Sequence, residues 1–326
     1  MPEDRHGRNI NYLRLSLTDA CNLRCVYCMP EDQRFRKHDE LLRDEEIIRL
    51  IRIFADVGFE KFRLTGGEPT LRQGIVDIVR AIASTDGVRK VAMTTNAILL
   101  KHLARPLADA GLHRINVSID TLNPKKFQEI TRWGNLNDVW RGINEAEAVG
   151  LEIKINAVVV RGFNDGEDAI ELARLSVDHG WQIRFIEVMP FGRISEFQQA
   201  HMVPEEELRA TIGAALGPLR LLNEGQLDGE ARLYSLDGAK GSLGFISSVT
   251  KPFCGGCNRA RLTADGKLRL CLLRDKELDL MPFVRTDADD EEIKALIKNS
   301  IWYKPWGHGL ADHIFPQKRV MSEIGG

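Results

Sequence analysis

The sequence has no long apolar run and almost no net charge. No segment approaches the roughly 20 apolar residues that a membrane-spanning helix needs, and the first ten residues, MPEDRHGRNI, lack the apolar centre of a signal peptide. The formal net charge of the 326 residues is −2, which gives no reason to expect binding to nucleic acid or to an acidic membrane surface. These absences predict a cytoplasmic protein that binds neither nucleic acid nor membrane, and any anion site must be a local cluster of cations.

Cysteine is scarce and unevenly placed. The six cysteines form two groups of three near opposite ends of the chain. In a reducing cytoplasm thiols stay free, and no disulfide pattern explains why both groups are tight triads. The grouping therefore favours metal ligation over disulfides at Cys21, Cys25, Cys28, Cys254, Cys257 and Cys271.

The first two thirds of the chain alternate strand-like and helix-like segments. Helical periodicity is clearest at 44–57, where apolar residues recur at three- and four-residue steps before Gly58. Such alternation predicts a parallel sheet, and six units are too few for an eight-unit barrel. The expected fold is α/β, an incomplete (βα)6 TIM-like barrel. Strands are expected at 11–17, 61–65, 89–95, 114–119, 152–159 and 182–188, and further helices near 74–83, 99–110, 138–149, 167–179 and 204–216.

Polar and apolar residues alternate within these strands. Leu13 and Leu15, for example, lie on the face opposite Arg14. A parallel strand buried on both faces is apolar throughout, so the apolar face suits a helix layer and the polar face suits a cavity. A single cationic side chain on the polar face of a strand is usually a salt-bridge partner near the strand end. Four of the same parity in four strands favour an anion pocket: Arg14, Arg63, Lys154 and Arg184.

After residue 218 the pattern changes to short strand-like runs at 219–222, 231–236 and 242–247, and we divide the chain into 1–218 and a smaller α+β region, 219–326. Asp265-Gly266 between two alternating runs predicts a hairpin. A two-residue turn there pairs Ala264 with Lys267, sets Cys271 opposite Ala260, and returns Cys271 toward the other two C-terminal cysteines. A helix is expected at about 290–301.

The first triad has the spacing C-x3-C-x2-C and follows the first strand, at the end where barrel enzymes place their chemistry. A closed zinc site needs four ligands, and an iron–sulfur cubane is usually held by four thiolates, so three thiolates leave one iron open. The motif is similar to the signature of the radical S-adenosylmethionine superfamily. Residues 66–69, Gly-Gly-Glu-Pro, resemble its GGEP motif, for which the structural alternative is a tight glycine turn.

The second triad, C-x2-C-x13-C, again offers three thiolates. Its alternative is a zinc site completed by His308 or His313, but beside the first triad a second open cluster is favoured. With Asn258-Arg259-Ala260-Arg261, it resembles the GTP 3′,8-cyclase family within that superfamily. The resemblance extends along the chain through YLRLS at 12–16, RLTGGEPTLR at 63–72, INVSID at 115–120, RFIEVM at 184–189 and the terminal Ile-Gly-Gly at 324–326.

This resemblance implies a lyase that performs the first step of molybdenum cofactor (molybdopterin) biosynthesis. It implies a [4Fe-4S] cluster on each triad, with S-adenosyl-L-methionine on the first and GTP on the second. A 5′-deoxyadenosyl radical would take the ribose 3′ hydrogen, and C3′ would bond to guanine C8 to give 3′,8-cyclo-7,8-dihydro-GTP, with no side chain acting as a catalyst. The implied cofactor contacts are Tyr27, Gly67, Ser118 and Met189, and the implied GTP contacts are Arg14, Arg63, Thr94, Lys154, Arg184, Arg259, Ala260 and Arg261.

The resemblance also implies an electron donor such as flavodoxin or ferredoxin, a downstream cyclic pyranopterin monophosphate synthase, a homodimer, and a Gly-Gly tail that enters the active site. One departure is Ala97, which stands where the resemblance calls for glycine, and a different local turn is expected because alanine tolerates a positive φ poorly.

Two alternatives remain. A peptide-modifying maturase with an auxiliary cluster predicts a longer cysteine-rich C-terminal region, and a zinc-stabilised nucleic-acid-binding protein predicts a basic face.

Overall fold

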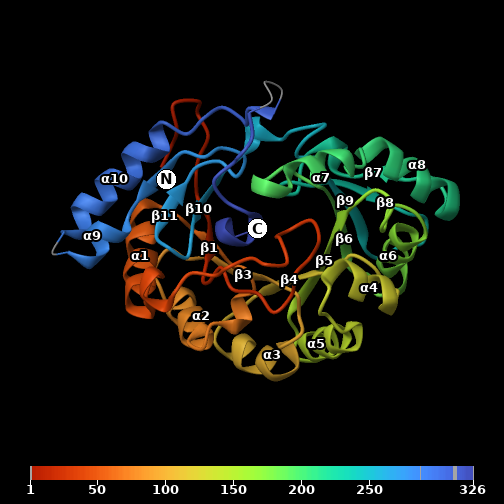
Figure 1. Ribbon diagram of the computed structural model, residues 1–326, viewed down its shortest axis with the longest axis horizontal. Helices are drawn as coiled ribbons and strands as arrows, with labels where there is room; N and C mark the ends of the chain where they lie inside the picture. The colour runs from red at the N-terminus through yellow and green to blue at the C-terminus, as the bar shows by residue number, and fades with distance from the viewer. Residues whose placement is uncertain (1, 287, 311–313, 326) are drawn as a thin grey trace.

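One curved sheet organises the computed structural model, which describes residues 2–286, 288–310 and 314–325 (Figure 1). Its twelve strands in that part of the chain have the order β12-β11-β10-β1-β2-β3-β4-β5-β6-β9-β8-β7. The central six are parallel and follow the chain order, as strand–helix alternation predicts. They are β1 (Tyr12–Ser16), β2 (Lys61–Thr65), β3 (Lys90–Thr95), β4 (Arg114–Ser118), β5 (Glu152–Val159) and β6 (Gln182–Glu187).

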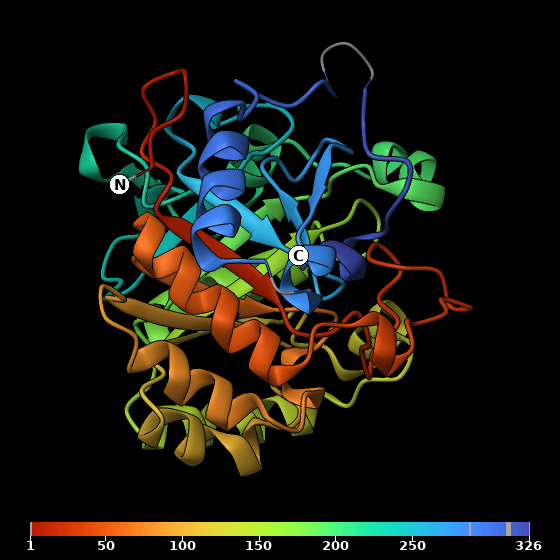
Figure 2. The same ribbon diagram turned by 90° about the vertical axis from the view of Figure 1, so that its left-hand side faces the viewer.

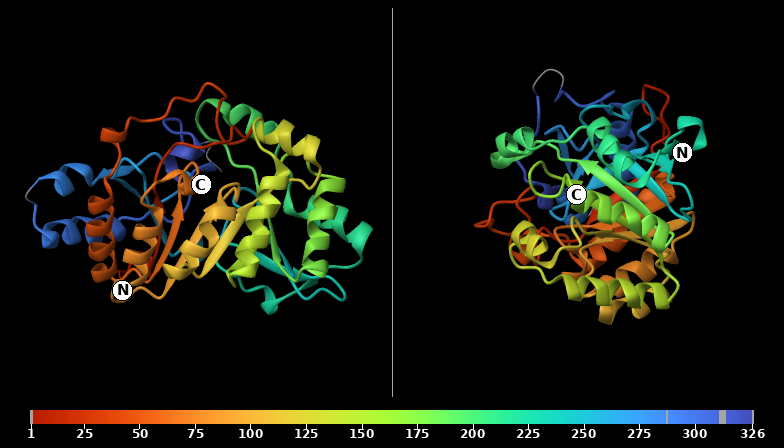
Figure 3. Two further views of the ribbon diagram at one scale, coloured as in Figure 1. Left: turned by 90° about the horizontal axis from the view of Figure 1, so that it is seen from below. Right: turned by 90° about the vertical axis from the view of Figure 1, so that its right-hand side faces the viewer.

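Helices cover the outer side of the six central strands (Figures 1 and 3). The outward strand residues Leu13 and Leu15 are fully buried in the same apolar core as Leu50 and Phe54 of the first helix. None of the described helices is long and apolar enough to cross a membrane. The helices of this half are α1 (Asp44–Val57), α2 (Ile75–Ala83), α3 (Leu100–Asp109), α4 (Pro124–Thr131), α5 (Leu136–Ala148), α6 (Glu167–Asp178), α7 (Ser195–Ala200) and α8 (Glu205–Leu216).

The C-terminal third extends the sheet at both edges. Beside β6 lie β9 (Ser242–Ile246), β8 (Arg232–Ser235) and β7 (Arg220–Leu221), and beside β1 lie β10 (Arg259–Leu262), β11 (Lys267–Arg269) and β12 (Glu277–Asp279). Helix α10 (Asp290–Trp302) packs next to α1 (Figure 2). The other elements are α9 (Met281–Arg285), α11 (Met321–Ile324) and the 3-10 turns η1 (His38–Glu40), η2 (Pro69–Leu71), η3 (Gly192–Ile194), η4 (Asn223–Gly225) and η5 (Cys254–Gly256).

The six predicted N-terminal strands are confirmed to within one residue at each end, and α1 has the predicted bounds. Within residues 1–218, two of the described helices were not predicted, α4 and α7. Both are short, and the sequence of α4, PKKFQEIT, is mostly polar and begins with proline. Its start signal is local: the Asn123 side chain accepts hydrogen bonds from the backbone N–H groups of Lys125 and Lys126, and proline suits the first helical position.

The predicted register of the β10–β11 hairpin is wrong by one residue. Arg261 lies opposite Arg269 and Leu262 opposite Leu268, so the turn is the three-residue loop 264–266 rather than a two-residue turn. Gly266 adopts the left-handed conformation at φ 74°, as the last residue of such a loop does. Cys271 therefore does not pair with Ala260; it follows the end of the ladder, in the loop after β11.

Close packing of α3 and α5 gives a stability prediction. A Cβ at Gly142 in α5 would overlap the carbonyl oxygen of Ala97, which belongs to the fixed turn before α3. Glycine-to-alanine changes inside helices usually stabilise by about 1 kcal/mol, but overpacking here should dominate and make Gly142→Ala less stable by about 2 kcal/mol. Urea unfolding followed by circular dichroism measures the difference.

Gly213→Ala in α8 is the matched control. Its added Cβ would lie 3.4 Å from the Leu219 side chain, an ordinary contact, so this variant should be neutral or up to about 1 kcal/mol more stable. A Gly142→Ala protein as stable as the Gly213→Ala protein would contradict the described packing of α3 on α5.

Candidate active site

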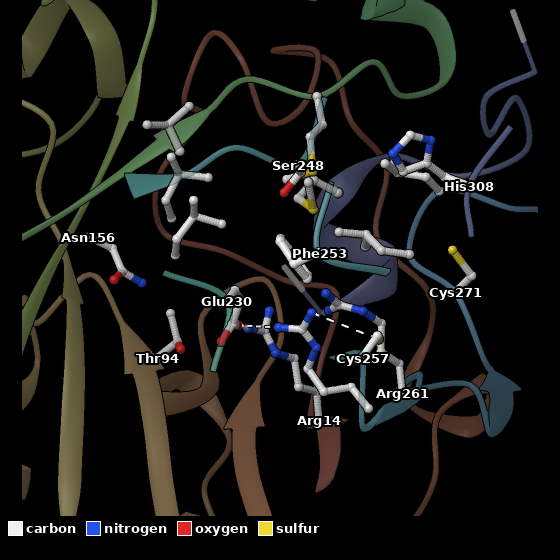
Figure 4. Close-up of a pocket in the computed structure, with 18 of the residues that line it drawn as sticks. Arg14, Thr94, Asn156, Glu230, Ser248, Phe253, Cys257, Arg261, Cys271 and His308 are labelled. Carbon is white, nitrogen blue, oxygen red and sulfur yellow. Dashed lines mark hydrogen bonds and ion pairs between the residues drawn. The ribbon is translucent and has the colours of Figure 1, made fainter. Parts of the chain in front are cut away.

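A cavity opens on the inner side of the sheet, opposite the helix layer (Figure 4). The side chains that reach it have the parity that the sequence assigns to the polar face. Each of the six central strands contributes a polar side chain: Arg14 from β1, Arg63 from β2, Thr94 from β3, Ser118 from β4, Asn156 from β5 and Arg184 from β6. The polar alternation of the strands therefore builds one continuous wall.

Strand β10 brings the C-terminal segment to the same wall. It pairs in parallel with β1, with Arg261 directly opposite Arg14, while Arg63 lies opposite Arg14 on the other side. Cys254 and Cys257, in the loop before β10, and Cys271, in the loop after β11, also line the cavity. We call Arg14, Arg63, Arg184, Arg259 and Arg261 the arginine cluster; all five line the cavity.

Two carboxylates line the same cavity, Asp120 and Glu230. Glu230 accepts a hydrogen bond from Arg14 and pairs with Arg259 Nη1 at 2.5 Å. Burial acts to raise the pKa of Glu230, but Arg259 and Arg14 hold it well below the usual range. Asp120 is engaged elsewhere, since it accepts from the Tyr27 hydroxyl at 2.7 Å and from the Val158 backbone N–H at 2.8 Å.

The arginine cluster carries more positive charge than these carboxylates balance. Burial, with Arg63 as a neighbour, lowers the pKa of Arg184, and burial next to Arg14 lowers that of Arg261. Nε of Arg63 and both Nε and Nη2 of Arg184 have no hydrogen-bond partner among the described residues, although the two residues are only 5% and 4% exposed. Buried donors need acceptors, and arginine matches phosphate oxygens. The cluster thus fits a polyanion such as a triphosphate.

The first cysteine triad lies on the loop after β1. Burial raises the pKa of Cys21 to about 11 and that of Cys28 to about 12, and Cys25 is shifted upward by burial, by Asp120 and by the two other thiols. The three thiols therefore interact with one another and, without metal, hold their protons. Metal binding would displace those protons.

The second triad has a different electrostatic setting. Burial acts to raise the pKa of Cys257, but Arg259 and Lys304 lower it to about 6, which favours the thiolate that ligates metal. Lys304, which the sequence did not indicate, donates to the backbone carbonyls of Arg259 at 2.8 Å and of Leu270. It thus ties together the two segments that carry these cysteines.

The arrangement of donors bears on the zinc alternative. Within the described ranges, no three His, Cys, Asp or Glu side chains lie close enough together to hold one metal ion. A tetrahedral zinc ion needs all its ligands around one centre, whereas a cubane takes each thiolate on a different iron. His308 lines the cavity, and His313 lies outside the described residues. Three thiolates at each triad are the number that leaves one iron of a cubane open.

The glycine-rich loop after β2 braces the first cysteine loop. A Cβ at Gly67 would overlap the carbonyl oxygen of Ala20, and the Gly67 N–H donates to the Thr18 carbonyl at 2.7 Å. Buried Glu68 accepts from the hydroxyls of Thr70 and Thr95 and from the Asn96 N–H. Gly67 is therefore positioned by backbone contacts and does not itself line the cavity.

The turn after β3 continues this brace. The Asn96 side-chain amide donates to the Asn22 side chain at 2.7 Å, which connects β3 to the cysteine loop. Ala97 keeps a left-handed conformation at φ 64°, so the different turn expected from alanine is not found. Thr94 stays in the cavity wall.

The remaining predicted contacts are divided between the cavity and its surroundings. Tyr27, Ser118 and Met189 line the cavity. Lys154 does not; its ammonium group pairs with Asp228 at 3.1 Å. The Ala260 side chain lies in the hydrophobic core, on the opposite face of β10 from its two arginine neighbours, so only its backbone is available to a ligand.

Several residues of the lining were not named as site residues from the sequence, among them the polar residues Asp120, Asn156 and Glu230. Strand parity could have identified two of them, because Asp120 follows Ser118 by two residues and Asn156 follows Lys154 by two. Burial raises the pKa of Asp120 to about 6, although the Tyr27 hydroxyl opposes the shift. Glu230 belongs to a turn in the loop before β8, where no periodic signal exists.

The C-terminal tail connects the two cysteine regions. The Ser322 backbone N–H lies near enough to the Cys28 thiol to act against the rise of its pKa, and the Gly325 carbonyl accepts from Arg261 Nη1 at 2.6 Å. Gly325 has φ 79°, and a Cβ there would lie 2.5 Å from Thr65 Oγ1. Met321 lines the cavity, and Gly326 lies outside the described residues.

This packing gives a prediction for the tail. Gly325→Ala, or residues appended after Gly326, should reduce turnover at least about tenfold, because a side chain at position 325 is both strained and crowded. A tag before Met1 should leave turnover unchanged. Steady-state rates of the three proteins at equal iron content make the comparison, and equal rates for the N- and C-terminally extended forms would count against a role for the tail.

Two family models match the chain. Residues 15–175 match the model described as Radical SAM superfamily, and residues 181–310 match the one described as Molybdenum Cofactor Synthesis C. These two segments carry the first and the second cysteine triad respectively.

Curated relatives are similar over their full length. The GTP 3′,8-cyclase of Pelotomaculum thermopropionicum is 45% identical over 326 residues, which cover 99% of this chain and 100% of the relative. That of Thermodesulfovibrio yellowstonii is 46% identical over 328 residues, with the same coverage. Among solved structures, Streptococcus suis SuiB bound to its precursor peptide SuiA is similar with a TM-score of 0.62 at 16% identity, over 89% of this chain and 68% of that one. This last likeness concerns the fold alone.

Proposed function

The chain belongs to the family of GTP 3′,8-cyclases, radical S-adenosylmethionine enzymes, and we propose that the cavity lined by the arginine cluster is where it closes GTP to 3′,8-cyclo-7,8-dihydro-GTP. The reaction is the first step of molybdenum cofactor biosynthesis, and the enzyme is a lyase. The observation that carries the assignment of the cavity is the set of buried, unpartnered guanidinium donors of Arg63 and Arg184, which need acceptors and suit an anionic ligand.

The family implies a [4Fe-4S] cluster and S-adenosylmethionine as cofactors. Cys21, Cys25 and Cys28 would hold the first cluster, and Tyr27, Gly67, Ser118 and Met189 would contact S-adenosylmethionine. When bound, this pair supplies the radical that takes the ribose 3′ hydrogen. We propose a second [4Fe-4S] cluster on Cys254, Cys257 and Cys271, whose open iron holds the guanine edge; the depressed pKa of Cys257 supports ligation there.

The side chains of the wall bind and orient GTP. The arginine cluster would take the triphosphate through charge-assisted hydrogen bonds, with Thr94 in the same wall. Lys154, which pairs with Asp228 outside the lining, would join them. Ala260 would contribute its backbone. Fixing the phosphates at one end and the base at the other holds ribose C3′ against guanine C8, and this orientation is the main contribution of the protein to ring closure.

The finer architecture and partners form part of the same proposal. The curved parallel sheet would serve as the incomplete (βα)6 barrel of residues 1–218, and residues 219–326 would form the auxiliary-cluster region with the Gly-Gly tail. A flavodoxin or ferredoxin would donate electrons, cyclic pyranopterin monophosphate synthase would consume the product, and the enzyme would act in the cytoplasm as a homodimer.

The maturase alternative predicts a longer cysteine-rich C-terminal region and an open groove for a peptide. The chain has three C-terminal cysteines, a cationic cavity, and relatives named as GTP 3′,8-cyclases along its whole length. These observations favour the nucleotide reaction.

The direct test uses anaerobically reconstituted protein with dithionite, S-adenosylmethionine and one nucleotide at a time. Formation of 5′-deoxyadenosine should depend on GTP and fall to background with ATP, because the base must fit the second cluster. Liquid chromatography with mass detection measures 5′-deoxyadenosine and the cyclised product together. Equal 5′-deoxyadenosine formation with ATP would refute the proposed substrate.

Serine variants separate the two triads. Cys25→Ser should abolish both S-adenosylmethionine binding and product, since the first cluster holds the cofactor. Cys254→Ser should abolish product and spare S-adenosylmethionine binding, as measured by equilibrium dialysis. Loss of cofactor binding in Cys254→Ser would mean that the two triads do not form independent sites.

A further inference from the structure

Glu230 occupies an unusual place for an acidic residue, because it faces the side chains expected to bind an anion (Figure 4). It is 5% exposed and contacts Arg14 and Arg259, one on β1 and the other on β10. Its carboxylate thus stands where strands from the two halves of the chain meet. A phosphate group would seek the same two guanidinium groups.

Glu230 lies in the loop before β8 and not on one of the strands that form the cavity wall. Asp228 and Ala231 exchange two backbone hydrogen bonds across a tight turn, with Gly229 and Glu230 at its corners. Gly229 has φ 66°, and a Cβ there would meet no atom within 4 Å. The turn is thus closed by its own backbone, so a rotation of the Glu230 side chain away from the arginines would not require the turn to unfold.

Charge balance explains why a carboxylate is needed without nucleotide. Five buried or nearly buried arginines on one wall repel one another, and removing the partner of a buried charge is strongly destabilising. Glu230 is the acidic neighbour whose charge opposes the effect of burial on Arg14, Arg184 and Arg261. The same negative charge repels a triphosphate that enters the cavity.

We propose that Glu230 is the internal counterion of the arginine cluster and that phosphate oxygens of the substrate replace it on Arg14 and Arg259, so that Glu230 sets the affinity for the nucleotide. This inference rests on the proposed function for the identity of the substrate. It does not depend on the guanine base, because the exchange concerns only the phosphate end. Glu230 is a positioning and affinity-determining residue and takes no part in bond making.

The test compares wild type, Glu230→Gln and Glu224→Gln, each reconstituted with iron and sulfide under anaerobic conditions. Glu224 lies in the same loop, is exposed, and removes the same charge away from the cluster. Inorganic tripolyphosphate is the first probe, and GTP is the second. Isothermal titration calorimetry gives the affinity, and thermal unfolding gives the stability with and without each probe.

Glu230→Gln should bind tripolyphosphate and GTP about tenfold more tightly than wild type, because the competing carboxylate charge is gone. Its ligand-free melting temperature should be lower, because the arginines lose their counterion, and the rise in melting temperature on adding tripolyphosphate should be larger. Glu224→Gln should match wild type in all three measurements. A purely structural Glu230 would lower the melting temperature and leave the tripolyphosphate affinity unchanged, and that result overturns the proposal, as does weaker binding.

A second measurement does not depend on the variant folding. A crystal structure of the wild-type protein with tripolyphosphate should show phosphate oxygens on Arg14 and Arg259 with Glu230 turned away, and Glu230 still on both arginines overturns the exchange. If Glu230→Gln binds tripolyphosphate more tightly but the wild-type protein does not turn over GTP, the proposed function is wrong and the exchange stands. GTP turnover together with a tripolyphosphate affinity of Glu230→Gln equal to that of wild type would overturn the exchange and leave the proposed function standing.

Discussion

The parallel pairing of β10 with β1 is the interaction on which the cavity depends. This register sets Arg261 beside Arg14, and the β1–β2 register sets Arg63 on the other side. Three guanidinium groups from segments far apart in sequence thereby share one face of three adjacent strands. Such an arrangement is unfavourable by itself and becomes stable only with an anion in the cavity, whether the Glu230 carboxylate or the phosphates of a ligand.

The two cysteine regions are attached to this wall by different means. The Asn96 side chain, just after β3, donates to Asn22 of the first loop, and Lys304 holds the second region through two backbone carbonyls. The tail then spans the two regions, from Cys28 to Arg261. These attachments are polar and partly buried, which suits a site whose ligands must be held in one orientation before a radical forms.

Period-two alternation was enough to predict the wall, because the sheet is covered by helices on one side and by a polar cavity on the other. It placed Arg14, Arg63 and Arg184 correctly before any comparison with relatives. Lys154 has the right parity and lies outside the lining, because parity fixes the face of a strand but not how far along the strand the cavity extends. The cysteine spacing likewise indicated two metal sites and, in the first loop, their location at the end of a strand.

What the sequence could not indicate depends on loops and on register. The β10–β11 turn has three residues, which Asp-Gly alone does not distinguish from two. Glu230 and Lys304 act through contacts between segments far apart in sequence, and no local periodicity marks them. The short helix α4 depends on a cap and a proline rather than on an apolar stripe.

The proposed mechanism centres on two open cubanes that would face one cavity, and iron counting with Mössbauer spectroscopy tests them most directly. Anaerobically purified protein should contain about eight iron atoms and about eight sulfides per chain, all in cubane clusters. The triple variant Cys254→Ser, Cys257→Ser, Cys271→Ser should retain about four of each. A wild-type protein with about four iron atoms per chain, or with zinc on the C-terminal triad, would contradict the second cluster and the guanine anchor that it provides.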